Sequence, residues 1–231
     1  MVFQRISGIS AIAAGVTYII GFWVYFAVLG PAQYGSPEVP VTQHVRFLVD
    51  NQGLMNAWNL VIYVLNAALM VFIVVGLHQR VKAGNEALAQ AASAFGIIWA
   101  GLILAAGMLE NISLSQIVRL SGQDMEAAAT LWRSTTVVGA ALGGGNEITG
   151  GLWIFLLSVV GFQTKSIPAP VNVAGALVGG AGIVSTIPLL SGATMIFGLG
   201  FILWFFAIGL VLVFSKALSG EVSAVRRPES A

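Results

Sequence analysis

Two carboxylates, Glu110 and Glu147, lie inside long apolar stretches of this sequence. A charged side chain at the centre of a bilayer costs on the order of 2.5–3.5 kcal/mol, so such residues usually face a cavity or a partner. A carboxylate in that position can hold a proton or a cation, and two close together can act as an acid and a base. These two residues are therefore the first candidates for chemistry.

Counting residues predicts that the two carboxylates meet. Helical residues rise about 1.5 Å each. Glu110 counted from Ala94, and Glu147 counted back from Phe162, then reach similar depths in the outer part of the bilayer. The helices that carry them are neighbours in sequence and antiparallel, so the side chains are predicted to face each other.

Amide side chains reach the same level from a preceding apolar stretch. Asn56 and Asn59 are three residues apart and share a helix face. We predict an outward-opening polar pocket, with Arg133 as the counter-charge of Glu147. The predicted ligand-binding residues are Asn56, Asn59, Glu110, Asn111, Asn146, Glu147 and Arg133. No catalytic residue, metal ligand or cofactor is assigned.

The same residues also have structural interpretations, which stay open. Glu110 precedes the polar segment 113–119, a pattern typical of a helix that emerges into water. A carboxylate near a helix N-terminus, as predicted for Glu147, is stabilised by the helix dipole without any ligand. Asn59 can serve as an interhelical hydrogen bond, worth about 0.6 kcal/mol.

Composition indicates a lipid environment and excludes several classes of function. Of 231 residues, 58% are hydrophobic and 8% are charged, whereas a soluble domain carries roughly 25% charged residues. The net charge of +1 offers no basic face for nucleic acid. Cysteine is absent, which excludes disulfides and thiolate metal sites. The two histidines, His44 and His78, fall on opposite predicted faces and cannot ligate one haem.

The predicted fold class is all-α, a polytopic bundle of about six transmembrane helices, because each span needs about 20 apolar residues. The predicted spans are residues 6–29, 54–77, 91–119, 131–162, 171–189 and 193–214. They form one domain, 1–218, followed by a cytoplasmic polar tail, 219–231. Within the fourth span we predict an approach helix capped by Asp124 and a break at Gly143-Gly144-Gly145. Residues 41–51 are predicted to form a short interfacial helix.

Lysine and arginine positions predict that both termini face the cytoplasm, since these residues concentrate in inner loops. The predicted inner segments hold seven of them and the outer segments hold three. The inner residues are Arg5, Arg80, Lys82, Lys165, Lys216, Arg226 and Arg227, and the outer residues are Arg46, Arg119 and Arg133.

Two pairs of glycines spaced four apart, Gly139/Gly143 and Gly175/Gly179, place small residues on one helix face. Such faces let two helix backbones approach closely. They are typical of dimer contacts and also of ordinary packing within a bundle.

The sequence resembles a family of uncharacterised bacterial six-span membrane proteins, known only as a domain of unknown function. The resemblance rests on short motifs: Arg5-Ile6-Ser7-Gly8-Ile9, Glu110, Leu152-Trp153, Lys165-Ser166-Ile167-Pro168, and Leu203-Trp204-Phe205 after a glycine-rich fifth span. The long outer segment 30–52 is less typical of the pattern. The resemblance covers most of the chain and implies a bacterial inner-membrane location; it implies no activity.

Three functional hypotheses follow. The first is a non-enzymatic membrane protein that binds or translocates a small ligand or a proton through the polar pocket. The second is an accessory or scaffold subunit of a larger membrane complex, suggested by the small-residue faces. The third is a lipid-acting membrane enzyme that uses Glu110 and Glu147 as acid and base. The expected partners are the lipid bilayer and either further copies of the chain or a complex subunit.

Overall fold

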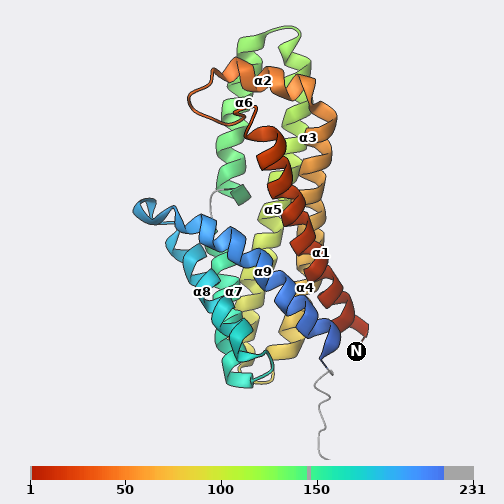
Figure 1. Cartoon of the computed structure of the whole chain (residues 1–231), viewed down its shortest axis with the longest axis vertical. Coiled ribbons are helices and arrows are strands. Elements are labelled where there is room, and N and C mark those ends of the chain that lie inside the picture. The colour runs from red at the N-terminus through yellow and green to blue at the C-terminus, as the bar shows by residue number, and fades with distance from the viewer. Residues whose placement is uncertain (1, 145–146, 216–231) are drawn as a thin grey trace, which may run out of the picture.

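The computed structural model describes residues 2–144 and 147–215. These residues form helices and no strand, which confirms the all-α helix bundle (Figure 1). Three stretches contain π turns: α1 (Val2–Val24) with η1 (Tyr25–Leu29); α3 (Gln52–Asn59), η2 (Leu60–Leu65) and α4 (Asn66–Val81); and α6 (Met125–Gly139) with η3 (Ala140–Gly144). The other helices are α2 (Val41–Asp50), α5 (Glu86–Ser121), α7 (Ile148–Thr164), α8 (Ala169–Val184), the short η4 (Pro188–Leu190) and α9 (Ala193–Phe214).

Five helical segments are long and apolar enough to cross a membrane. They are Val2–Leu29, Gln52–Val81, Glu86–Ser121, Met125–Thr164 and Ala193–Phe214. Helix α8 is also apolar but has 16 residues, which span about 24 Å, less than a bilayer core of about 30 Å. This arrangement is that of a multi-pass membrane protein.

Two of the predicted spans differ from the observed helices at informative points. Helix α8 ends at Val184, five residues before the predicted end at residue 189. Proline disfavours helical geometry in the preceding residue, and Ile187, just before Pro188, is extended with φ −81° and ψ 120°. In the fourth span, η3 ends at Gly144 and α7 begins at Ile148. The predicted tail, 219–231, lies outside the described residues.

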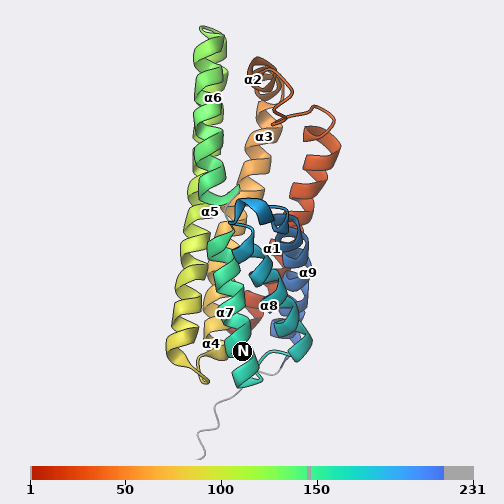
Figure 2. The same cartoon turned by 90° about the vertical axis from the view of Figure 1, so that its left-hand side faces the viewer.

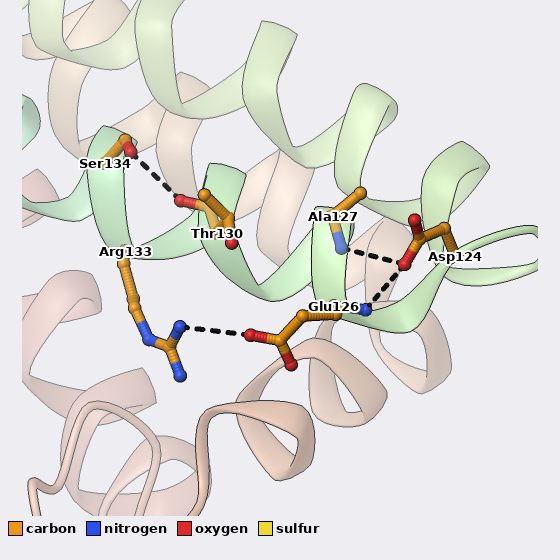
Figure 3. A network of polar contacts seen from close by, with 6 residues as sticks. All are labelled: Asp124, Glu126, Ala127, Thr130, Arg133 and Ser134. Atoms are coloured by element: carbon orange, nitrogen blue, oxygen red, sulfur yellow. Dashed lines mark hydrogen bonds and ion pairs between the residues drawn. The ribbon is translucent and has the colours of Figure 1, made fainter.

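Asp124 begins helix α6 as predicted. Its side chain accepts hydrogen bonds of 3.0 Å from the backbone N–H groups of Glu126 and Ala127 (Figure 3). These bonds satisfy two of the donors that every helix N-terminus leaves unpaired.

The buried side chains divide into two hydrophobic cores along the long axis of the molecule. The lower core is shared by α1, α4, α5, α7, α8 and α9, and includes Trp99, Trp153 and Phe201. The upper core is formed where α2, α3 and α6 gather around the far ends of α1 and α5 (Figure 2). Helix α5, with 36 residues, is long enough to contribute to both.

Helix α2 matches the predicted short helix but packs on protein. Val45 and Leu48 are 0% and 4% exposed and belong to the upper core, and α2 contacts α5 and α6. The apolar face that the sequence assigned to the membrane interface is therefore covered by helices that extend past the predicted span ends.

Both glycine pairs pack inside the bundle. A Cβ at Gly179 would lie 2.7 Å from the carbonyl oxygen of Gly151 on α7, and one at Gly143 would lie 3.4 Å from the Cα of Ile103 on α5. These contacts favour the packing interpretation, because the small-residue faces are already occupied by neighbouring helices of the same chain.

Candidate functional site

Glycine contacts define how α5 lies against the segment formed by α6, η3 and α7. Gly139 packs against the carboxylate of Glu110, and Gly150 packs against the ring of Trp99. From Glu110 to Trp99 is eleven residues down α5, and from Gly139 to Gly150 is eleven residues along the antiparallel segment. The same register therefore holds for α6 and for α7.

A hollow beside Glu110 lies within the upper core, since Leu48, Met55, Leu114 and Ile117 belong to both. The space in which the centre of a water molecule can lie is about 10 Å³, which is room for about one water molecule. Side chains from the α1–α2 connection and from α2, α3, α5 and α6 form its wall. They are Tyr34, Leu48, Met55, Asn59, Glu110, Ser113, Leu114, Ile117, Trp132 and Thr135. We call this hollow the Glu110 pocket.

The polar hydrogens in the wall of the Glu110 pocket are mostly engaged elsewhere. Ser113 Oγ donates to the backbone carbonyl of Glu110 at 3.2 Å, and Thr135 Oγ1 donates to that of Leu131 at 2.9 Å. Asn59 Nδ2 donates to Asn111 Oδ1 at 3.3 Å. What these groups still offer is mainly oxygen lone pairs, so the pocket is rich in hydrogen-bond acceptors.

Aromatic rings close the pocket on the side of α2. Trp132 Nε1 donates to the hydroxyl of Tyr34 at 3.0 Å, and the Trp132 ring stacks on His44 with centroids 4.6 Å apart. His44, 2% exposed, is fixed by two backbone contacts: Gly35 N–H donates to Nδ1 at 3.4 Å, and Nε2 lies 3.2 Å from the carbonyl of Ser36. His44 is therefore a buried structural residue of the upper core.

The tyrosine in this wall gives a testable pH dependence. Burial raises the pKa of Tyr34 to about 12 from its ordinary value of 10.0, although the hydrogen bond with Trp132 works in the opposite direction. Between these two values the unfolded chain releases a proton that the folded chain keeps, so the free energy of unfolding falls as pH rises through that window.

We expect Tyr34→Phe to be less stable than the parent protein near neutral pH, because the N–H of Trp132 loses its acceptor at a cost of about 1–3 kcal/mol. The difference in stability between the two proteins should narrow above about pH 10, because only the parent loses stability through the titration of Tyr34. Melting temperatures measured from neutral pH to about pH 11.5 check this, and a gap that stays constant would show that Tyr34 does not titrate as described.

The structure brings three of the predicted site residues together. Asn59, Glu110 and Asn111 meet where α3 crosses α5, through the hydrogen bond between the two amides and the shared pocket wall. Asn56 is half-buried one turn away and is not part of that wall. Asn146 lies outside the described residues.

Arg133 does not serve as the counter-charge of Glu147. Its guanidinium pairs with Glu126 on the same helix at 3.5 Å, and both side chains are largely exposed (Figure 3). Exposed pairs of this kind contribute roughly 0–1 kcal/mol. It is the one ion pair within residues 2–144 and 147–215, so both Glu110 and Glu147 lack a cationic partner there.

Glu147 lies deeper than Glu110, at the N-terminal boundary of α7. It is half-buried, and its side chain forms no capping hydrogen bond. Its carboxylate interacts electrostatically with the phenols of Tyr18 on α1 and Tyr63 in η2, and Tyr63 interacts with Glu110 as well. Tyr63 packs on Gly107 of α5 and is therefore close to both carboxylates.

The two carboxylates occupy different levels, contrary to the predicted face-to-face arrangement. The register places Glu147 opposite about residue 102 of α5, eight residues below Glu110, or about 12 Å along the axis. The sequence count began at Ala94, whereas α5 begins at Glu86 with Asn85 as its N-cap. Starting eight residues too late placed Glu110 about 12 Å too close to the inner end of the bundle, so it seemed as deep as Glu147.

An aromatic cluster lies directly below Glu147. It consists of Trp99, Trp153, Phe197, Phe201, Trp204 and Phe205, each at most 2% exposed. Neighbouring rings are 4.3–6.1 Å apart, and Tyr18 rests on Phe201 and Phe205. We call this group the aromatic cluster. The α4–α5 and α7–α8 turns lie at one end of the bundle (Figure 2), and Trp99 and Trp153 are nearer to that end than Glu110 and Glu147 are along α5 and α7.

Sequence analysis missed the aromatic wall of the pocket. Tyr34 falls in the outer segment 30–52 and Trp132 in the predicted span 131–162, and neither is among the predicted site residues. A usable signal was present on α6, where Trp132 and Thr135 are three residues apart and share a face. Tyr34 has no such periodicity, because it lies between helices.

The family model that matches this chain covers residues 6–215 and is described as a domain of unknown function, DUF4386. This agrees with the predicted resemblance to an uncharacterised family. No curated protein and no solved structure matches the chain.

Proposed function

This chain belongs to the DUF4386 family, a domain of unknown function, and on that premise we propose a role from its own residues. The protein binds an ammonium ion, or the ammonium end of an amine, in the Glu110 pocket of a multi-pass membrane bundle. One observation carries the proposal: Glu110 borders a hollow, and no cation pairs with it in the parts of the chain that the structure describes.

Charge and hydrogen bonding favour a cation over an anion or a neutral donor-poor ligand. The hydroxyls of Ser113 and Thr135 donate to their own helices and leave lone pairs for a ligand. Ammonium N–H groups would donate to these oxygens and to the carboxylate of Glu110. Hydrogen bonds between ionised partners are roughly twice as strong as neutral ones.

The size of the pocket supports a small charged group. An ammonium ion is close in size to the single water that fits the pocket. The remainder of a larger amine would occupy the open mouth, and the aromatic rings of Trp132 and Tyr34 in the wall would attract the ammonium group. The aromatic cluster beneath Glu147 is tightly packed. This supports binding of the ligand in the Glu110 pocket and gives no support to its passage through the bundle.

We also propose the orientation that the sequence predicts, with the α2 end outside a bacterial cytoplasmic membrane. The basic residues Arg5, Arg80, Lys82 and Lys165 lie near the opposite end, where α1 begins, α4 ends and α7 ends. Labelling of single cysteines introduced at residues 36 and 84 of this cysteine-free chain distinguishes the two orientations.

Two alternative functions lose their main support. The scaffold hypothesis rested on small-residue faces, and these pack within the bundle. The lipid-acting enzyme requires Glu110 and Glu147 to reach one substrate bond. Their backbone levels differ by about 12 Å along α5, so the two side chains do not project from facing positions.

The proposal is tested by titrating methylammonium chloride into the protein in nanodiscs at constant ionic strength, with tryptophan fluorescence as the readout. Trp132 in the pocket wall is the reporter. We expect a saturable change in the parent protein. Glu110→Gln should weaken binding by about tenfold to a hundredfold, because it removes a charge-assisted hydrogen bond worth about 1.5–3 kcal/mol.

Glu126→Gln is the matched control, since it removes an exposed carboxylate on the neighbouring helix without touching the pocket. Gly139→Ala is a second probe, because the added methyl group would displace the Glu110 carboxylate while keeping its charge. Equal binding by Glu110→Gln and the parent, or no saturable change in the parent, would contradict the proposal.

A further inference from the structure

A second polar layer lies below the Glu110 pocket, at the level of Glu147. The register against α5 locates its members. Val64 packs on Gly107 and Val74 packs on Gly96, which places Asn66 of α4 opposite about residue 105. Glu147 lies opposite about residue 102, so the two residues are within about 5 Å of each other along the bundle axis. Helices α4 and α7 are in direct contact.

Two oxygen atoms in this layer are buried without a donor. Asn66 is 1% exposed; its Nδ2 donates to Thr17 Oγ1 at 2.7 Å, while its Oδ1 has no hydrogen-bond partner in the described part of the chain. Thr149 Oγ1, two residues after Glu147, is likewise buried and unpartnered. Buried polar atoms are nearly always paired in folded proteins, so each such atom needs an explanation.

The donor set of the layer consists of oxygens and carries one formal charge. It comprises the Glu147 carboxylate, the amide oxygen of Asn66 and the hydroxyl of Thr149, with the phenols of Tyr18 and Tyr63 in electrostatic contact with Glu147. Carbonyl, hydroxyl and carboxylate oxygens suit hard cations. A divalent ion is less suited, because no group of three or more acidic or histidine side chains gathers among the described residues.

The backbone around Glu147 also favours a small monovalent cation. The α6–η3 segment ends at Gly144 and α7 begins at Ile148, and Gly143 packs on Ile103 at the same level of α5. Interrupted membrane helices expose carbonyl ends that coordinate small cations in transporters. The geometry points to a second site, separate from the Glu110 pocket, that binds one dehydrated alkali-metal cation between Asn66, Glu147 and Thr149.

The experiment measures melting temperature in detergent while choline chloride is replaced by sodium chloride, or by potassium chloride, at constant ionic strength. A ligand that binds only the folded state raises stability with its concentration. We expect a saturable rise in the parent protein with at least one of the two cations. Glu147→Gln should abolish the rise.

Two further variants keep the test informative if Glu147→Gln fails to fold. Thr149→Val keeps the side-chain shape and removes one oxygen, so we expect about a tenfold loss of cation affinity, the size of one lost ligand. Glu110→Gln should keep the full response, which separates this site from the Glu110 pocket.

Several results would overturn the inference. These are no response of the parent to either alkali cation, a response to pH alone, an unchanged response in Glu147→Gln or Thr149→Val, and a loss of the response in Glu110→Gln. The last result would assign the alkali-cation response to the Glu110 pocket. If the parent protein failed to bind methylammonium but kept its alkali-cation response, the proposed function would fail and this second site would not be affected.

Discussion

Trp153→Ala is expected to destabilise the protein by about 3–5 kcal/mol, the usual cost of removing a buried tryptophan from a packed core. Trp153 is 1% exposed at the centre of the aromatic cluster. Its ring lies 6.0 Å from those of Trp99 and Phe201 and 5.8 Å from that of Trp204. Three helices, α5, α7 and α9, therefore lose a shared contact when it is truncated.

The matched control is Trp23→Ala. Trp23 is on α1 and is 65% exposed on the outer surface of the bundle, so its loss removes the same ring without opening a cavity. Thermal unfolding in one detergent, followed by helical circular dichroism, compares the two variants. A similar loss for both would show that the aromatic cluster does not hold the lower core together.

Gly179→Ala is expected to destabilise the contact between α7 and α8 by about 1–3 kcal/mol, the typical cost of overpacking. The added Cβ would lie 2.7 Å from both the carbonyl oxygen of Gly151 and the backbone nitrogen of Phe155. Backbone atoms cannot rotate away as a side chain can, so the two helices must move apart.

The adjacent residue provides the control for this prediction. A Cβ at Gly180 meets nothing within 4 Å, and alanine in a helix is favoured over glycine by roughly 0.5–1 kcal/mol. Gly180→Ala should therefore be neutral or stabilising in the same melting experiment. If Gly179→Ala is equally harmless, α7 and α8 do not depend on close backbone approach.

The helices themselves could be predicted because lipid solvent acts on each segment separately. Apolar runs separated by prolines, glycines and charges mark where backbone hydrogen bonds must be satisfied internally. The expected range 193–214 coincides with α9 (Ala193–Phe214), and the Asp124 cap was predictable because N-capping involves residues only two or three positions apart. Local chemistry was sufficient in both cases.

The upper core and the pocket could not be predicted in the same way. Tyr34, Trp132 and Glu110 are far apart in sequence and meet only because α2, α5 and α6 pack together and place the α1–α2 connection beside α6. For Arg133 a local contact was overlooked. The sequence allowed it to pair with Glu147, but in the structure it pairs with Glu126, two turns away on the same helix.

The sequence by itself determined that this polypeptide is an α-helical membrane protein and that Glu110 and Glu147 are its unusual charges, because the cost of placing a carboxylate in hydrocarbon depends on residue type and depth. Only the tertiary structure decided that the two carboxylates occupy separate layers with Tyr63 close to both. The register of two long antiparallel helices depends on where glycines allow close contact. It is set by both contacting surfaces together, so it cannot be predicted from either segment alone.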